Sequence, residues 1–313
     1  MGSKYICDLD DKVNRKSVSY KNRYGLKIAG DLYTSKDFNE NKKYPALIVG
    51  APYGGVKEQG PCVYANQLAQ RGFVVLTFDQ SFMGESEGEP RNVSSPDIFT
   101  ENFSAAVDFL GVQDFVNREK IGVIGICGSG GFSLSAAQMD PRIKAIVTAS
   151  MYDMSVAGRG ILNNDDLEKA KIEISHKRWE DFEKGTPEYL PTFPEEPTDV
   201  IPEGLDPVSE EFWRFYAFKR GHHPNARGNF TTTSQLSFFN FRLLDYIDEI
   251  SPRPILFIVG DRAHSKFFSE DAYAAANEPK ELLEIEDAEH IDLYDRLDKI
   301  PFDKIESFFK EAL

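Results

Sequence analysis

One stretch decides the fold: residues 120–131 read Lys-Ile-Gly-Val-Ile-Gly-Ile-Cys-Gly-Ser-Gly-Gly. The apolar, β-branched run from Ile121 to Ile126 has the length and composition of a strand that is buried on both faces. After the small residues around Cys127, residues 132–139 predict a helix. A reactive side chain between strand and helix, with small residues two positions before and after it, is typical of a nucleophile elbow. The sequence therefore predicts that Cys127 stands out over a sheet edge.

Ser129 offers a second reading of the same stretch, because it also has small residues two positions away on both sides. The predicted strand, however, ends directly before Cys127, so Ser129 falls within the first turn of the following helix. A helix that begins at Gly128 has a dipole that favours a thiolate at Cys127. The pattern thus favours a nucleophilic cysteine over the commoner role of a free cysteine, a small buried apolar residue.

Strands and helices alternate on both sides of this stretch. The apolar strands are continuous rather than alternating with polar residues, which indicates a mostly parallel sheet flanked by helices on both faces. Two antiparallel strands are expected at the start of the chain. The predicted strands are 17–22, 26–33, 46–49, 73–78, 121–126, 143–149, 254–259 and 281–285, and the predicted helices are 63–71, 96–110, 132–139, 269–277 and 301–313.

The alternation stops between residues 151 and 250. This segment is charged, rich in proline, and carries the aromatic run Phe-Trp-Arg-Phe-Tyr-Ala-Phe at 212–218. We therefore expect residues 1–150 and 251–313 to form one α/β core, with residues 151–250 as a helical or irregular cap inserted after the sixth strand. The aromatic run predicts packing within the cap, and an apolar pocket for an acyl group is the alternative.

Composition excludes several classes of protein. A chain of 313 residues can bury a substantial core, and 41% hydrophobic with 28% charged residues is typical of a globular protein. The net charge of −15 argues against nucleic acid or an anionic membrane as a partner. Cys7, Cys62 and Cys127 are too few and too scattered for a disulfide framework or a zinc site. A polar N-terminus without a long apolar run predicts a cytoplasmic location; the oligomeric state stays open, a homodimer included.

Ligands of an open α/β sheet bind at the carboxyl ends of its strands. Cys127, Asp261 and His290 fall at such ends, in the order nucleophile, acid, histidine, which is the chain order of the α/β-hydrolase triad. His290 is then the base that takes the thiol proton and later activates water. Asp261 is expected to orient His290, and Asp153 after the sixth strand is the alternative acid.

An oxyanion hole needs two backbone N–H groups aimed at the developing negative charge. Gly128, the residue after the nucleophile, is expected to provide one of them. The glycine-rich segment 50–55 is expected to provide the other from Tyr53, since its proline cannot donate. The other histidines are assigned no catalytic role: His222 and His223 are expected in solvated cap loops or along the pocket, and His264 beside Asp261.

Several stretches together resemble a known family. They are Gly54-Gly-Val-Lys-Glu-Gln59, Phe78-Asp-Gln-Ser-Phe-Met-Gly-Glu-Ser86, Ile124-Gly-Ile-Cys-Gly-Ser-Gly-Gly131, Tyr273, Glu278-Pro-Lys-Glu-Leu282 and His290-Ile-Asp-Leu-Tyr-Asp295. With them the chain resembles, over essentially its whole length, dienelactone-hydrolase-like members of the α/β-hydrolase superfamily, specifically a bacterial group with a cap. The resemblance implies the α/β-hydrolase fold, a cysteine nucleophile, and hydrolysis without a metal or organic cofactor. It does not imply dienelactone as the substrate, because the compact dienelactone enzyme lacks such a cap.

The sequence therefore predicts a hydrolase that cleaves a carboxylic ester, thioester or lactone of a small molecule. Cys127, His290 and Asp261 form its expected triad, and an acyl-enzyme is its expected intermediate. Two alternatives stay open. One is an acyltransferase or peptidase on the same scaffold, and the other is a non-catalytic protein that binds a small ligand in the capped pocket.

Overall fold

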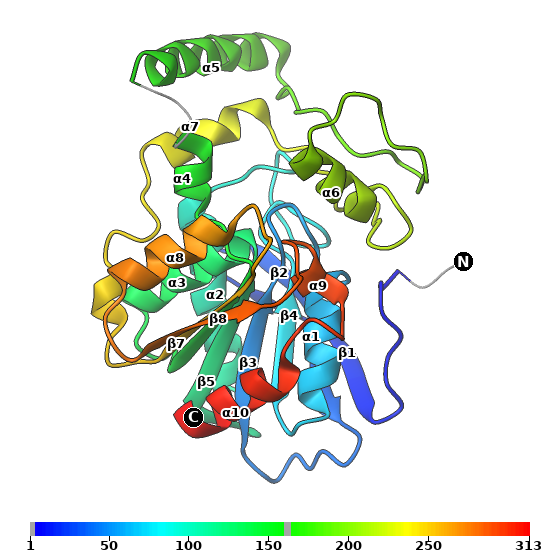
Figure 1. Cartoon of the computed structure of the whole chain (residues 1–313), viewed down its shortest axis with the longest axis vertical. Coiled ribbons are helices and arrows are strands. Elements are labelled where there is room, and N and C mark those ends of the chain that lie inside the picture. The colour runs from blue at the N-terminus through cyan, green and yellow to red at the C-terminus, as the bar shows by residue number, and fades with distance from the viewer. Residues whose placement is uncertain (1–3, 160–163) are drawn as a thin grey trace.

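The computed structural model describes residues 4–159 and 164–313. These residues form one eight-stranded sheet in the order β1-β2-β4-β3-β5-β6-β7-β8 (Figure 1). β2 pairs antiparallel with β1 and β4, and every other neighbouring pair is parallel, as the continuous apolar strands predict. The strands are β1 Val13–Lys21, β2 Lys27–Ser35, β3 Tyr44–Gly50, β4 Val74–Phe78, β5 Val116–Ile126, β6 Ala145–Ala149, β7 Ile255–Gly260 and β8 Lys280–Ile285.

Helices cover both faces of this sheet, and each face has its own apolar core. Neighbouring strand residues point to opposite faces, so Ile48 and Val123 enter one core while Val49 and Ile124 enter the other. The first core also contains residues of α2, α3 and α8, and the second contains residues of α1 and α10. The bounds are α1 Gly60–Ala69, α2 Pro96–Gly111, α3 Gly128–Met139, α8 Lys266–Ala275, α9 Asp292–Asp295 and α10 Phe302–Ala312.

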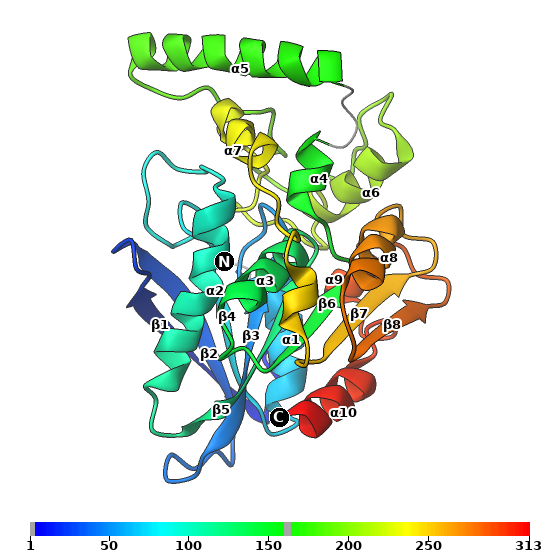
Figure 2. The same ribbon diagram turned by 90° about the vertical axis from the view of Figure 1, so that its left-hand side faces the viewer.

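Helices α4 to α7, from the segment between β6 and β7, lie beyond the carboxyl ends of the parallel strands, as both views show (Figures 1 and 2). Its proline-rich part, around 187–202, is irregular as expected, whereas the long helix α5 is not foreseen by the sequence pattern. Phe230 and Phe238 from this segment join the core that α2 and α3 form, so its treatment as a separate cap stays a prediction. The helices are α4 Met154–Arg159, α5 Asn164–Lys184, α6 Pro207–Tyr216 and α7 Gln235–Phe239, with 3₁₀ turns at Thr232–Ser234 and Ile247–Ile250.

Within the described parts of the chain, the helices are all too short or too polar to cross a membrane.

Candidate active site

The turn between β5 and α3 has the strained geometry of a nucleophile elbow. Cys127 lies between the two elements with φ 53° and ψ −123°, a region that residues with a side chain rarely adopt. The flanking glycines are required by space. A Cβ atom at Gly125 would lie 2.3 Å from the Ser129 carbonyl oxygen, and one at Gly128 would lie 2.8 Å from the Tyr53 Cβ. The small residues that the sequence pattern singled out are therefore those that let the chain turn.

The same geometry separates the two readings of this stretch. Ser129 lies in the first turn of α3, is 1% exposed, and does not occupy the strained position. Its side chain faces the end of β3, because a Cβ atom at Gly50 would lie 2.7 Å from its hydroxyl oxygen. Cys127, and not Ser129, therefore occupies the strained position of the elbow.

The two N–H groups expected to bind an oxyanion lie beside the same sulfur. The backbone N–H groups of Tyr53 and Gly128 both approach the Cys127 thiol and favour its charged form, although burial raises the pKa of this thiol overall. Tyr53 belongs to the segment between β3 and α1, residues 51–59, which we call the oxyanion loop. The resting site thus holds a protonated thiol within a preformed pair of donors.

His290 is completely buried, and both of its ring nitrogens have hydroxyl partners. Its Nε2 lies 2.9 Å from the hydroxyl of Tyr294, and its Nδ1 lies 2.5 Å from that of Ser265. The Tyr294 hydroxyl also lies close to the Cys127 thiol, where it acts to lower the pKa of that thiol. Together these residues form a continuous polar path, Cys127–Tyr294–His290–Ser265, which we call the histidine chain.

The environment keeps the imidazole neutral. Burial lowers the pKa of His290 well below its usual range, and the nearby His264, whose ring centre lies 4.9 Å away, acts in the same direction. A neutral imidazole is the form that can accept a proton from a nucleophile. The geometry and the charge balance therefore both suit a general base.

The structure does not bring either predicted acid to His290. The Asp261 side chain is exposed, and its carboxylate accepts the backbone N–H of Ala288 at 3.3 Å. Asp153 instead caps α4, where it accepts the N–H of Ser155 at 2.9 Å. The expected Cys-His-Asp arrangement is therefore corrected in this structure, because Ser265 occupies the position beside Nδ1.

The positions of Asp261 and Ser265 after β7 explain why the serine, and not the aspartate, lies beside His290. Asp261 follows β7 immediately, so its side chain falls at the surface beside the loop after β8. Ser265 lies four residues further on, at the N-terminus of α8, and is completely buried. Asp261 comes too soon after β7 for its side chain to reach His290, and Ser265 is the next buried polar residue in the loop.

The carboxylate of Glu211, on α6, also reaches the site, and no sequence motif predicts it. Glu211 accepts the backbone N–H of Ile291 at 2.7 Å with one oxygen and lies 3.2 Å from Nδ1 of His264 with the other. The Nε2 of His264 lies 2.7 Å from the Tyr152 hydroxyl. A carboxylate from the segment between β6 and β7 thus contacts the residue that follows His290.

Aromatic rings close the site from above. The ring of Phe212 lies 5.5 Å from that of His290, and Tyr152 lies 5.1 Å from it on another side. Within the aromatic run 212–218, Phe215 packs in the core against Tyr294. The run therefore packs against the α/β core and beside His290, and its role in lining an acyl pocket stays a prediction. His222 and His223 lie elsewhere: the first pairs with the Pro194 carbonyl, and the second with the Asn225 N–H.

An apolar cavity of about 210 Å³ lies next to the elbow. Two of its lining residues, Tyr53 and Met154, are the side chains that a Cβ atom at Gly128 would meet, at 2.8 and 3.3 Å. Phe230 and Phe238 form much of its wall, and Phe230 stacks on Tyr53 with ring centres 4.2 Å apart. The cavity thus shares Tyr53 and Met154 with the immediate surroundings of Gly128.

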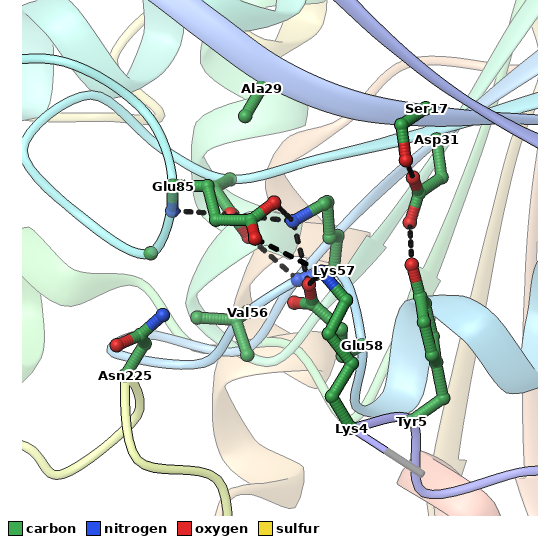
Figure 3. A network of polar contacts seen from close by, with 12 residues as sticks. Lys4, Tyr5, Ser17, Ala29, Asp31, Val56, Lys57, Glu58, Glu85 and Asn225 are labelled. Atoms are coloured by element: carbon green, nitrogen blue, oxygen red, sulfur yellow. Dashed lines mark hydrogen bonds and ion pairs between the residues drawn. The ribbon is translucent and has the colours of Figure 1, made fainter.

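A cluster of buried charges fixes the far end of the oxyanion loop (Figure 3). The Lys57 ammonium lies 2.7 Å from Glu58, 3.1 Å from Asp79 and 2.7 Å from Glu85, and Lys4 reaches the outer carboxylates. Asp79 also accepts the backbone N–H groups of Lys57 and Glu85, both at 2.8 Å. Burial raises the pKa of Asp79 to about 6, whereas the two lysines hold that of Glu85 at about 2. This lysine cluster joins two of the stretches that carry the family resemblance.

Fold and site together define an α/β-hydrolase of the hydrolase or acyltransferase kind. The chain belongs to the family described as X-Pro dipeptidyl-peptidase (S15 family), which matches residues 25–183. The expected resemblance to dienelactone-hydrolase-like proteins is confirmed for the superfamily and its fold. A solved dienelactone hydrolase from Anabaena variabilis is 14% identical, with a TM-score of 0.55 over 96% of this chain and 99% of that one.

Several relatives in sequence extend over most of the chain. Protein PA2218 of Pseudomonas aeruginosa is 51% identical over 97% of this chain and 82% of its own length. Its crystal structure, compared over 99% of this chain and 97% of that chain, gives a TM-score of 0.94 at 48% identity. Thiohydrolase aneE of Aspergillus aculeatus is 26% identical over 85% of this chain and 83% of its own. The α/β-hydrolase GrgF of Penicillium sp., also named a polyketide transferase, has a TM-score of 0.79 at 23% identity. The comparison covers 96% of this chain and 99% of that one.

Proposed function

We propose that this protein is a cysteine hydrolase that cleaves a carboxylic ester, thioester or lactone through an acyl-enzyme on Cys127. The observation that carries the proposal is the position of this thiol. It lies on a strained elbow, between two backbone N–H donors and at one end of a hydroxyl path to a neutral histidine. The name of the relative thiohydrolase aneE supports a thioester among these substrates.

The path gives each proton a defined place. As the Cys127 sulfur attacks the carbonyl carbon, its proton passes to the Tyr294 oxygen while the Tyr294 proton passes to Nε2 of His290. The tautomer of His290 that can accept this proton at Nε2 carries its own hydrogen on Nδ1. This Nδ1–H group donates a hydrogen bond to the Ser265 hydroxyl oxygen. The N–H groups of Tyr53 and Gly128 bind the oxyanion, and the leaving group departs with the proton from His290.

Hydrolysis of the acyl-enzyme then uses the same groups in reverse. Water loses a proton through Tyr294 to His290, attacks the thioester carbonyl, and releases the acid as the sulfur regains its proton. A serine hydroxyl stabilises an imidazolium less than a carboxylate does, which makes His290 a weaker base than in a Ser-His-Asp triad. A thiol is far more acidic than an alcohol, so the weaker base suffices. The absence of an acid from the histidine chain therefore fits the identity of the nucleophile.

The substrate class follows from the surroundings of the thiol. The cavity beside the elbow is walled by Phe230, Phe238 and Met154 and suits a short or branched apolar acyl group. An acyl-enzyme on sulfur is itself a thioester, so esters, lactones and thioesters are activated enough to form it and amides are poor substrates. The protein is therefore expected to leave Xaa-Pro-p-nitroanilides uncleaved, despite the name of its family.

The proposal is tested with a panel of p-nitrophenyl esters and acyl thioesters of increasing chain length. We expect the wild-type protein to hydrolyse short members, and Cys127→Ala to lose about 10³-fold or more of kcat, in keeping with removal of a nucleophile that acts as part of a unit. Ser129→Ala is the matched control and should keep most activity. Full activity in Cys127→Ala, or loss in Ser129→Ala alone, would contradict the proposal. An inactive wild type that binds a small ligand tightly would instead favour a binding protein.

Acyl transfer is the second candidate. The transferase name of GrgF and the nearly complete burial of Cys127, which is 5% exposed, favour it, because a closed site limits access of bulk water to the acyl-enzyme. The two reactions are separated by the products formed from one acyl thioester with and without an alcohol acceptor. Hydrolysis predicts free acid in both cases, whereas transfer predicts an ester that replaces the acid as the alcohol concentration rises.

A further inference from the structure

We propose that Cys7 and Cys62 are a redox pair that forms a reversible disulfide and fastens the N-terminal segment to α1. Both are free cysteines, and their sulfur atoms lie 2.8 Å apart. This separation lies between a covalent disulfide bond of ~2.05 Å and an ordinary contact of two sulfur atoms. The pair is distinct from Cys127 at the elbow, and none of the catalytic steps above uses it.

The backbone on both sides of Cys7 is fixed against the same face of α1. Before it, the N–H of Ile6 donates to the Glu58 carbonyl at 3.0 Å. After it, the Asn66 side chain donates to the Asp8 carbonyl and accepts the N–H of Asp10, both at 3.0 Å. Asn66 lies one helical turn beyond Cys62, and Glu58 lies one turn before it. The register of these contacts places Cys7 directly on Cys62.

Side chains at the start of the segment add to this anchoring (Figure 3). Lys4 lies 3.1 Å from Glu58 and 3.0 Å from Glu85, and the Tyr5 hydroxyl donates to Asp31 at 2.8 Å. Because the two sulfurs are already held together, closure of the bond requires little loss of chain entropy in the folded protein. The two cysteines are therefore positioned for an intramolecular disulfide rather than for bonds between molecules.

The two thiols are chemically unequal. Cys7 is partly exposed, and its hydrogen bond with Cys62, assisted by Arg15, lowers the pKa of its thiol. Cys62 is completely buried, and burial raises the pKa of its thiol. A low-pKa, accessible thiol beside a second cysteine is the arrangement of a redox-sensitive pair, in which the first is oxidised and the second resolves it.

Hydrogen peroxide can oxidise the Cys7 and Cys62 thiols to the disulfide in two steps. The Cys7 thiolate attacks one oxygen of hydrogen peroxide, the O–O bond breaks, and the departing hydroxide takes up a proton to form water, which leaves a sulfenic acid. The Cys62 sulfur then loses its proton and attacks the Cys7 sulfur, the S–O bond breaks, and a second water leaves. In total the two thiols give two protons and two electrons to the peroxide.

The test uses the full chain with Cys127→Ser, which removes the third thiol. After treatment with hydrogen peroxide and denaturation, we expect the titratable thiols to fall from two to none, and a reductant to restore both. A non-reducing digest should contain the Cys7 and Cys62 peptides joined, with the mass of two hydrogens lost. Cys7→Ser and Cys62→Ser in the same background are the matched controls and should give no joined peptide.

A second measurement keeps the test decisive if Cys127→Ser disturbs folding. In the wild-type chain the titratable thiols should fall from three to one under oxidation by diamide, which spares single cysteines. The oxidised protein should also unfold at a higher denaturant concentration than the reduced protein, because the bond restricts the unfolded chain. Two thiols that stay titratable, a Cys7 sulfinic acid without a joined peptide, or dimers alone would overturn the proposal. None of these readouts depends on catalysis, so they stand apart from the proposed function.

Discussion

The oxyanion loop contacts two buried polar clusters of opposite character. At Tyr53 it meets the histidine chain, whose hydrogen bonds run between a thiol, hydroxyls and a neutral imidazole. At Lys57 it meets the lysine cluster, in which one ammonium contacts three carboxylates. Buried ions fix geometry strongly, because separating them leaves an uncompensated charge. Neutral hydroxyls hold their partners more weakly and can exchange protons. We therefore expect the ion pairs of the lysine cluster to hold the oxyanion loop in place, and the neutral groups of the histidine chain to allow transfer of a proton.

The largest effect is expected from breaking the lysine cluster. Lys57→Met leaves Asp79 buried without its cation and Glu58 with Lys4 alone, which should lower the free energy of unfolding by about 3–5 kcal/mol. Denaturant unfolding measures the change. Lys4→Met is the matched control, since the Lys4 side chain is 45% exposed and its ion pairs should be worth only about 0–1 kcal/mol. Equal losses in both variants would remove the distinction drawn between buried and exposed members.

Tyr294→Phe tests whether the histidine chain carries the proton. Removal of the hydroxyl interrupts the path between Cys127 and His290, so kcat should fall about 10²-fold or more while the fold is kept. The rate of single-turnover acylation is the direct measurement. Tyr64→Phe is the control, because it removes an equally buried hydroxyl that donates at 2.7 Å to the backbone carbonyl of Leu293 and not to a side chain of the histidine chain. An unchanged acylation rate in Tyr294→Phe would mean that Cys127 gives its proton to His290 directly.

Ser265→Ala and Asp261→Asn compare the observed with the expected partner of His290. The serine variant loses one neutral hydrogen bond to Nδ1, worth ~1 kcal/mol, and should lower kcat/KM about fivefold. The aspartate variant alters an exposed side chain and should leave kcat/KM unchanged. The opposite ranking would restore the Cys-His-Asp triad that the sequence predicted.

The smallest effect is a shift in pH dependence. The pKa of His290 is lowered by burial and by His264, so the base stays neutral as the pH falls through 6.5, and kcat/KM should decline only below that value. His264→Gln removes the neighbouring charge and should move this acid limb to higher pH. His223→Gln, which changes a buried histidine outside the site, should leave it in place. A limb that does not move in His264→Gln would show that burial alone sets the pKa.

Local sequence predicted most of the core and the close approach of three candidate site residues. An elbow and an oxyanion hole need small residues and backbone donors at fixed spacings from strand ends, so the position of Cys127 beside the N–H groups of Gly128 and Tyr53 could be predicted. The partners of His290 could not, since Ser265 and Tyr294 reach it through the way α8 and α9 pack. A carboxylate stands at the expected strand end, but the direction of its side chain is not encoded locally.

The segment between β6 and β7 was the least predictable for a similar reason. Its helix α5 is highly charged and buries only Leu167 and Ile174, so the apolar periodicity that reveals a helix is faint. Glu211 carries no local signal at all. Its role depends on α6 crossing above the end of β8, a contact between residues distant in the sequence.

Glu211 ties helix α6 to the loop that carries His290. The carboxylate holds the backbone next to His290 and the ring of His264 at once, and Phe212 on the same helix covers His290. Displacement of α6 would therefore break its contact with the loop that carries His290 and uncover the imidazole ring at the same time.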